Sequence, residues 1–268
     1  MDVSFGQYYP SSSFVHKCDP RTKFLFLILY IVLIFIAQNF YALGLCALIF
    51  VLSVCFSGVP IKSVLKSVKG ILFLLIFTAL LNLLFRFNDE SEKVLVDWWI
   101  ITITKEGLIQ TAFLAVRLIL LVTSSALLTL TTTPVSLTDG VESLLSPLKL
   151  VRFPVHAIAL VMSIALRFIP ILTDETARIM NAQKSRGADF ESGSIFKRIK
   201  AIIPVLFPLL VSALHRAAEL SDAMDARCYM GGKKRTKYKK LRFTWRDGVV
   251  LALSVLFLAG SILIRIFL

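Results

Sequence analysis

The sequence is poor in the residues that bind metals or form disulfides. Its cysteines and histidines are few and scattered: Cys18, Cys46, Cys55, Cys228, His16, His156 and His215. No CxxC pair occurs, although a zinc site or a disulfide framework needs its ligands at clustered spacing. We therefore expect no metal site, no disulfide and no cofactor bound by this chain itself.

The sequence also lacks a phosphate-binding loop of the form GxxxxGK[ST]. The stretch GGKKRT at 231–236 has glycines and lysines, but not at the required spacing. No nucleophile–base pair of useful specificity is present either. We expect a chain that is not an enzyme and has no catalytic residues, so any role driven by ATP depends on a partner's nucleotide site.

A third shortage is of polar residues. The chain is 57% hydrophobic with a mean hydropathy of +0.79, whereas soluble domains are about 45–50% apolar. The first residues show no short apolar core with a cleavage site, so we expect the first apolar helix to remain as an anchor. The expected fold class is an all-α integral membrane protein. It has about five transmembrane helices and a cytoplasmic or interfacial coupling domain with two long helices.

Apolar runs approach the roughly 17–25 residues that cross a bilayer. The expected spans are 22–38, 40–57, 70–87, 107–130 and 247–268, with Gln38-Asn39 as a tight turn between the first two. These spans divide the chain into an N-terminal membrane domain at 1–133, a coupling domain at 134–244 and a C-terminal transmembrane helix at 245–268.

The net charge of +13 orients these spans. Basic residues flank the first two spans on one side: Lys17, Arg21, Lys23, Lys62, Lys66 and Lys69. The 88–106 loop is acidic and carries Trp98 and Trp99, which suits the outer face. Residues 134–244 hold 18 Lys or Arg against nine Asp or Glu. By the positive-inside rule, we expect a multi-pass plasma-membrane protein with its N-terminus in the cytoplasm.

The block at 134–244 is basic, yet mostly helical in pattern. Asp139 and Glu142 open a predicted short helix that ends near Pro147, and two long helices follow at 154–186 and 195–230. A stripe of spacing 4,3,4,3 predicts that the long helices pack along a helix–helix seam. The seam residues are Ile169, Leu172 and Ile179 on the first helix, and Leu206, Leu210, Ala213, Ala217 and Leu220 on the second. We expect Pro170, Pro204 and Pro208 to bend these helices.

The stripes continue to Gln183 on the first helix and Met224 on the second, and three residues further each reaches an arginine between small residues at the helix end. The triplets are Ser185-Arg186-Gly187 and Ala226-Arg227-Cys228, with Gly187 and Gly231 as expected C-caps. A guanidinium offers planar, multidentate donors to another surface. A cation is also favourable at the C-terminus of its own helix. Docking to a partner and capping of the helix both remain open from the residues alone.

Segments along most of the chain carry a family resemblance. They are GQYYPSSSFVHKCDPRTK, TTTPVSLTDGVESLLSPLK, LRFIPILTDE, AQKSRGADF and AMDARCYMGG. Together, in this order, they resemble the transmembrane T component of energy-coupling factor transporters, the vitamin and metal-ion importers of prokaryotes. Cys18 stands where that family usually has leucine, and the family's tip pattern is usually Ala-Arg-Gly.

The resemblance implies three kinds of partner: two ABC-type ATPase subunits, a membrane-embedded S component that binds the vitamin, and the lipid bilayer. It implies that Ser185, Arg186, Gly187, Ala226, Arg227 and Cys228 form the ATPase-docking tips, and that ATP is bound by the partner subunits. The substrate, the sharing of S components and the ATPase that each arginine meets are not encoded here.

The sequence suggests two other functions. A self-sufficient secondary transporter usually carries ionisable residues at mid-membrane, but the interiors of the expected spans contain no Asp or Glu. The one charge in a span interior, Arg117, could face a helix interface, a water-filled cleft or the S component, could snorkel, or could pair with backbone carbonyls. A nucleic-acid binder is suggested by KKRTKYKKLR at 233–242, but stacking aromatics are sparse there. The position of this run beside the last span favours lipid headgroups, and we expect no nucleic acid.

Overall fold

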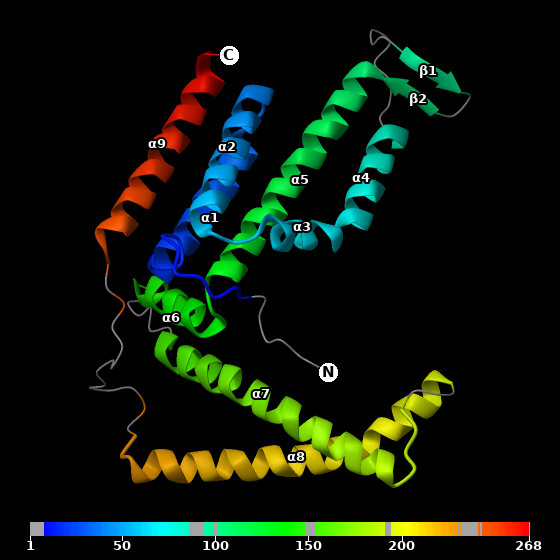
Figure 1. Cartoon of the computed structure of the whole chain (residues 1–268), viewed down its shortest axis with the longest axis vertical. Helices are drawn as coiled ribbons and strands as arrows, with labels where there is room; N and C mark the ends of the chain where they lie inside the picture. The colour runs from blue at the N-terminus through cyan, green and yellow to red at the C-terminus, as the bar shows by residue number, and fades with distance from the viewer. Residues whose placement is uncertain are drawn as a thin grey trace. The chain divides into compact units, whose positions relative to one another are not determined.

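The computed structural model describes residues 8–85, 94–98, 101–147, 154–190, 194–229, 231, 241 and 243–267. Helices dominate these residues (Figure 1), as expected for an all-α membrane protein. The helices are α1 (Pro20–Ile36), α2 (Phe40–Ser57), α3 (Ile61–Lys69), α4 (Leu72–Phe85), α5 (Lys105–Thr131), α6 (Pro134–Leu144), α7 (Val155–Ser185), α8 (Ile195–Ala226) and α9 (Trp245–Phe267). The chain forms two compact units, 1–140 with 241–268, and 141–240.

Three element boundaries differ from expectation. The predicted third span at 70–87 corresponds to α4, and a separate helix, α3, precedes it where a connecting turn was expected, with a bend of 54° at the break between the two. The short helix α6 begins at Pro134 rather than near Asp139, because the Ser136 N–H donates to Thr133 Oγ1 at 3.4 Å and proline suits a first helical position. The 88–106 loop contains an antiparallel pair, β1 (Val94–Trp98) and β2 (Ile101–Thr104), which are rich in β-branched residues.

Five helices in the described part of the chain are long and apolar enough to cross a membrane: α2, α5, α7, α8 and α9. The bent pair α3 and α4 makes a sixth if it counts as one span. The predicted set differs, since it included α1, which has only 17 residues, and placed α7 and α8 in the cytoplasm. Length and hydropathy do not distinguish a span from an apolar helix that a partner covers, so the cytoplasmic position of α7 and α8 stays a prediction.

The core of the first unit lies where α1, α2 and α5 meet. Ile34 and Cys46 are fully buried in it, together with Leu120 of α5. The Tyr30 hydroxyl donates to the Cys46 carbonyl at 2.9 Å and so ties α1 to α2. Other apolar side chains of this unit stay exposed, such as Phe73 on α4 at 81%. Exposed apolar surface of this kind is what lipid-facing helices require.

Arg117 on α5 contacts the backbone at the end of α1. Its Nη2 donates to the carbonyl of Ala37, the C-cap residue of α1, at 2.6 Å. Its guanidinium also lies over the Phe113 ring, 4.8 Å from the centroid. A helix C-terminus carries partial negative charge and favours a cation. Of the alternatives left open for Arg117, the structure therefore shows pairing with a backbone carbonyl.

Candidate functional site

The C-terminus of α7 ends on Arg186 in a double hydrogen-bonded cap. Arg186 is the C-cap residue, and Gly187 follows with φ +88°. The Ala188 N–H donates to the Gln183 carbonyl at 3.0 Å, and the Gly187 N–H donates to the Lys184 carbonyl at 3.0 Å. This is the Schellman pattern, in which a left-handed residue closes the helix. Gly187 thus caps the helix as predicted.

The C-terminus of α8 repeats this geometry. Arg227 is the C-cap residue, and Cys228 follows with φ +54°. The Tyr229 N–H donates to the Met224 carbonyl at 3.1 Å, and the Cys228 N–H donates to the Asp225 carbonyl at 2.9 Å. The helix therefore ends four residues earlier than predicted, and the left-handed position beside the arginine belongs to Cys228 rather than Gly231. A non-glycine residue costs roughly 1–2 kcal/mol there.

The left-handed backbone gives a physical reason for the Ala-Arg-Gly pattern of the resembling family. The third position of each triplet must adopt a positive φ, which glycine adopts without strain. Gly187 satisfies this requirement at the α7 tip, and Cys228 departs from it at the α8 tip. The arginine is held at the same backbone position in both tips.

The six tip residues are exposed: Ser185, Arg186, Gly187, Ala226, Arg227 and Cys228. Within the described residues, no ion pair and no hydrogen bond from either guanidinium is present. The capping of both helices is done by backbone groups. The donors of Arg186 and Arg227 are therefore available to another molecule, whereas the alternative in which each side chain caps its own helix finds no contact there.

The structure does not bring the two arginines together. The pair α7 and α8 converges near the C-terminal part of α7, and its two C-terminal tips lie at opposite ends of the pair (Figure 1). Each helix is about 46–48 Å long at 1.5 Å per residue. The tips are therefore two separate contact points rather than one site.

The contact between α7 and α8 differs from the predicted register in the first half of α8 and agrees with it at Ala213 and Leu220. On α7, the half-buried residues include Ile169, Leu172 and Ile179, as the stripe requires. On α8, Leu206 and Leu210 are 55% and 58% exposed.

The covered residues of α8 include Val205, Leu209, Ala213, Leu220 and Met224. Ala213, Leu220 and Met224 belong to the predicted stripe, whereas Val205 and Leu209 lie one residue before Leu206 and Leu210, and Ala217 is exposed. Most of these positions are four residues apart, and i±4 rows are the ridges with which crossing helices pack. A heptad seam requires near-parallel helices. The first half of α8 is apolar nearly all round, so the sequence could not fix the phase.

Among the described residues, an ion pair joins the two long helices. Arg216 Nη2 lies 3.6 Å from Glu175 Oε2, and both side chains are partly covered. At the other end of α7, His156 Nδ1 lies 3.5 Å from Glu142 Oε1 of α6. Pro204 and Pro208 lie inside α8, whose first turns are set at an angle to the rest (Figure 1). The two long helices cross where they meet (Figure 1), and the Arg216–Glu175 pair joins them.

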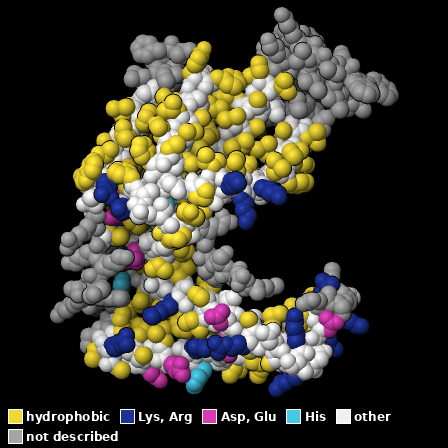
Figure 2. Space-filling view, viewed as in Figure 1, with side chains coloured by type: hydrophobic (Ala, Val, Ile, Leu, Met, Phe, Trp, Pro, Cys, Tyr) yellow, Lys and Arg dark blue, Asp and Glu magenta, His cyan; other side chains and the backbone are white. Residues whose placement is uncertain are grey.

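The outward faces of both long helices are apolar. Ile158 and Val161 on α7 are 43% and 63% exposed, and Phe207 and Leu214 on α8 are 70% and 63% exposed. In the space-filling view, hydrophobic side chains lie among the charged ones on this unit (Figure 2). Large apolar side chains exposed on both helices indicate a protein or membrane contact.

The N-terminal motif forms a junction, which the sequence did not reveal. The Lys23 ammonium is buried and donates to the carbonyls of Thr131, at 2.9 Å, and His16, at 3.3 Å. The Asp247 carboxylate is fully buried and accepts from the N–H of Asp19 and of Thr244, both at 2.8 Å. The position of Asp247 in the first turn of the last helix, where an acid is favourable, was the available signal for this role.

His16 completes this junction in its neutral form. Its Nε2–H donates to the Tyr9 carbonyl at 2.9 Å, so Nδ1 accepts from the Ser13 hydroxyl at 2.7 Å. Burial lowers the pKa of His16 despite the opposing hydrogen bond to Tyr9, and nearby Lys23 lowers it further. Burial raises the pKa of the Cys18 thiol, which keeps it protonated and unreactive.

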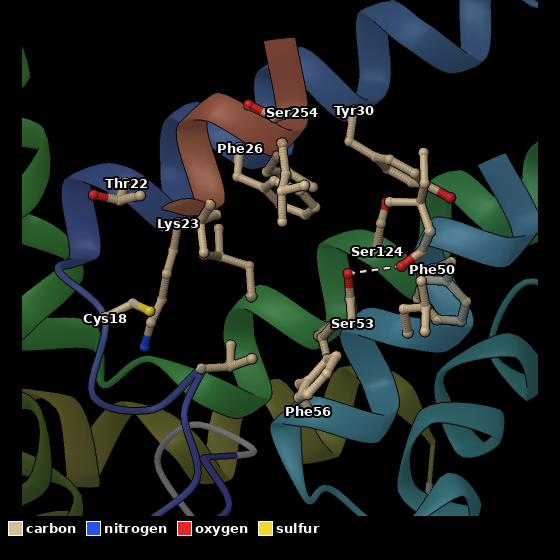
Figure 3. Close-up of a pocket in the computed structure, with 18 of the residues that line it drawn as sticks. Cys18, Thr22, Lys23, Phe26, Tyr30, Phe50, Ser53, Phe56, Ser124 and Ser254 are labelled. Atoms are coloured by element: carbon tan, nitrogen blue, oxygen red, sulfur yellow. Dashed lines mark hydrogen bonds between the residues drawn. The ribbon is translucent and has the colours of Figure 1, made fainter. Parts of the chain in front are cut away.

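A cavity of about 320 Å³ lies in the first unit between α1, α2, α5 and α9. Its wall is almost entirely apolar, with Phe26, Phe50 and Phe56 prominent and Cys18 and Lys23 at one end (Figure 3). The cavity could hold an apolar group, but its lysine is already bonded to two carbonyls. No group of three or more His, Cys, Asp or Glu that could hold a metal occurs among the described residues.

Comparisons with known proteins agree along nearly the whole chain. A family model described as CbiQ, cobalt transport protein, matches residues 11–238. An energy-coupling factor transporter transmembrane protein EcfT from Ruminiclostridium cellulolyticum is 45% identical over 264 residues, which are 98% of this chain and 97% of that protein. The protein of the same name from Bacillus subtilis is 44% identical over 252 residues, 94% of each chain. A third, from Brevibacillus brevis, is 46% identical over 255 residues, 95% of each.

Proposed function

This chain belongs to the CbiQ family as a transmembrane component of energy-coupling factor transporters, and from that premise we propose that it couples two ATPases to a substrate-binding membrane subunit. The substrate-binding subunit is the S component, and the cargo is a vitamin. ATP is bound and hydrolysed by the partners, and this chain transmits their motion.

The observation that carries the proposal is the pair of exposed arginine tips. Arg186 and Arg227 occupy the same cap geometry, at the ends of two crossed helices, with their guanidinium donors unengaged in the described part of the chain. Two equivalent tips at opposite ends suit two similar partners, one for each tip. A multidentate cation on a closed helix end fits a groove lined with carboxylates or carbonyls.

Transmission needs a body that moves as one piece. The ion pair between Arg216 and Glu175 and the half-buried face through Ala213 join α7 to α8. The exposed apolar residues of 155–170 and 200–215 are the proposed contact with the S component, because they are too hydrophobic for water. Movement of the tips would thereby reach the S component.

The experiment that tests the proposal is a pull-down of the tagged chain from its native membrane. Wild type should retain two ATPase subunits and a small membrane-embedded binding protein. We expect the Arg186→Ala, Arg227→Ala variant to lose the ATPases, because truncating a buried hot-spot arginine costs about 2–4 kcal/mol, or roughly 30- to 1000-fold in affinity.

The matched control changes two exposed arginines within the same helices, Arg178→Ala and Arg198→Ala. This variant removes the same charge but leaves both tips intact, so it should retain the ATPases. Equal recovery of the ATPases with the tip variant would contradict the proposal. Purification of the chain alone from wild type, with transport by the isolated chain, would support a self-sufficient secondary transporter instead.

A further inference from the structure

The short helix α3 has three kinds of surface around its axis. Val64 is buried at 4% in the core cluster with Leu127 and Leu130 of α5. Ile61 and Leu65 are 65% and 60% exposed. The lysines Lys62, Lys66 and Lys69 are also exposed. At about 100° per residue, these lysines fall within one arc of roughly 60°, directly beside the exposed apolar pair.

The lysines have no acidic neighbour to neutralise them. No described carboxylate lies within ion-pair distance of any of the three. In the space-filling view, dark blue side chains gather where α3 lies, against hydrophobic side chains of the same unit (Figure 2). The positive charge of α3 is therefore directed outward and uncompensated.

The position of α3 in the chain indicates its depth. The next helix, α4, is apolar from Leu72 to Leu81, and its axis turns 54° from that of α3. A lysine at the centre of a bilayer costs roughly 2.5–3.5 kcal/mol, so three of them exclude α3 from the hydrocarbon. Its exposed Ile61 and Leu65 are equally unsuited to bulk water. Only the boundary between acyl chains and headgroups accommodates both.

We propose that α3 is an interfacial helix whose lysines bind the anionic headgroups of phospholipids. Ile61 and Leu65 insert at the level of the first acyl carbons, and Lys62, Lys66 and Lys69 reach the phosphates beside them. An acidic protein would match the lysines but not the apolar pair, which a lipid surface matches as well. Because Val64 fixes α3 on α5, the bound headgroups lie against the membrane unit.

The test uses the full chain reconstituted in vesicles of phosphatidylcholine with phosphatidylglycerol. A fluorophore is attached at Leu65→Cys after the exposed Cys55 and Cys228 are changed to serine; Cys18 and Cys46 are buried. Quenching by brominated phosphatidylglycerol is compared with quenching by brominated phosphatidylcholine at equal mole fraction. We expect a preference for the anionic lipid of about fivefold or more, since one lysine near an anionic surface contributes about that factor.

Lys62→Gln, Lys66→Gln, Lys69→Gln should abolish the preference, and the triple change to arginine should retain it. The control Lys197→Gln, Arg198→Gln, Lys200→Gln removes three exposed charges from α8 and should leave the signal at Leu65→Cys unchanged. Equal quenching by both lipids in the labelled Leu65→Cys protein with all three lysines present would overturn the proposal. So would loss of a co-purified acidic protein from the glutamine variant without any lipid preference. Neither result depends on the arginine tips, so neither would contradict the ATPase-docking proposal.

Discussion

The buried charges of the first unit and the arginine tips of the second are used in opposite ways. In the first unit, Asp247, Lys23 and Arg117 are bonded to backbone groups of neighbouring segments. In the second unit, Arg186 and Arg227 are exposed, and their backbone caps leave the guanidinium groups unengaged within the described residues. A charge bonded to backbone stabilises a scaffold, and one left exposed is available to a partner. The difference predicts that substitutions at these buried charges affect stability and that substitutions at the arginine tips affect assembly.

The largest effect on stability is expected at Asp247. Asp247→Ala leaves the N–H groups of Asp19 and Thr244 without their acceptor, and each such loss costs about 1–3 kcal/mol. We expect the free energy of unfolding in detergent to fall by roughly 3 kcal/mol in total. The free energy of unfolding of Asp247→Asn should lie between those of wild type and Asp247→Ala, because the asparagine amide keeps one accepting oxygen. Asp222→Ala, at an exposed carboxylate of α8, is the control and should have little effect. An equal decrease in the free energy of unfolding in Asp247→Ala and Asp222→Ala would contradict the stabilising role of the buried carboxylate.

The next effect concerns the crossed helices. Ala213→Phe overpacks the half-buried face of α8, which typically costs about 1–3 kcal/mol. We expect ATP hydrolysis without uptake, because the tips can dock while the pair no longer moves as one body. Ala217→Phe places the same ring on an exposed position and should transport nearly as wild type. If Ala217→Phe is the uncoupled variant, the predicted heptad register is right for the assembled transporter.

A smaller difference is expected between two glycines with open space around them. Gly187→Ala forces a side chain into φ +88° at the α7 tip and should cost about 1 kcal/mol. Gly248→Ala, within the first turns of α9, should stabilise by about 0.5–1 kcal/mol, because alanine restricts the unfolded chain. Hydrogen exchange at residues 183–190 and thermal unfolding measure the two effects. Slower exchange at the α7 tip in Gly187→Ala would contradict the assigned backbone strain.

The smallest effect is the pH dependence at His16. Its pKa is lowered in the folded protein by burial, so the unfolded chain binds more protons just below pH 6.5. The stabilisation is complete above pH 6.5 and is lost as pH falls toward the lower folded pKa. His16→Gln should reduce this slope in thermal unfolding between pH 7.5 and 5. His215→Gln, which changes an exposed histidine of α8, is the control and should leave the slope unchanged. An unchanged slope in His16→Gln would exclude a neutral His16 as its cause.

Some helical boundaries followed closely from the sequence because they depend on local signals. The Gln38-Asn39 break separates α1 from α2, and Gly187 marks the end of α7 through its own backbone preference. The start of α6 at Pro134 and the end of α8 at Ala226 were predicted wrongly. The arginine tips were also found from spacing, since their position relative to the helix end is local. The phase of the contact in the first half of α8 was not predicted correctly, because an apolar surface all round a helix leaves the packed face undetermined.

By itself, the sequence determined the class of molecule: apolar composition requires helices in a membrane, and small-Arg-small triplets end its two long helices. Only the tertiary structure decided the partners of the charges. Asp247 meets Asp19 across 228 residues of chain, and Arg117 meets Ala37 across 80. Such pairs carry no periodic signal, because a carboxylate or guanidinium that binds a backbone group places no demand on the partner's side chain. The same freedom hid the junction at Lys23, whose acceptors are carbonyls that every residue possesses.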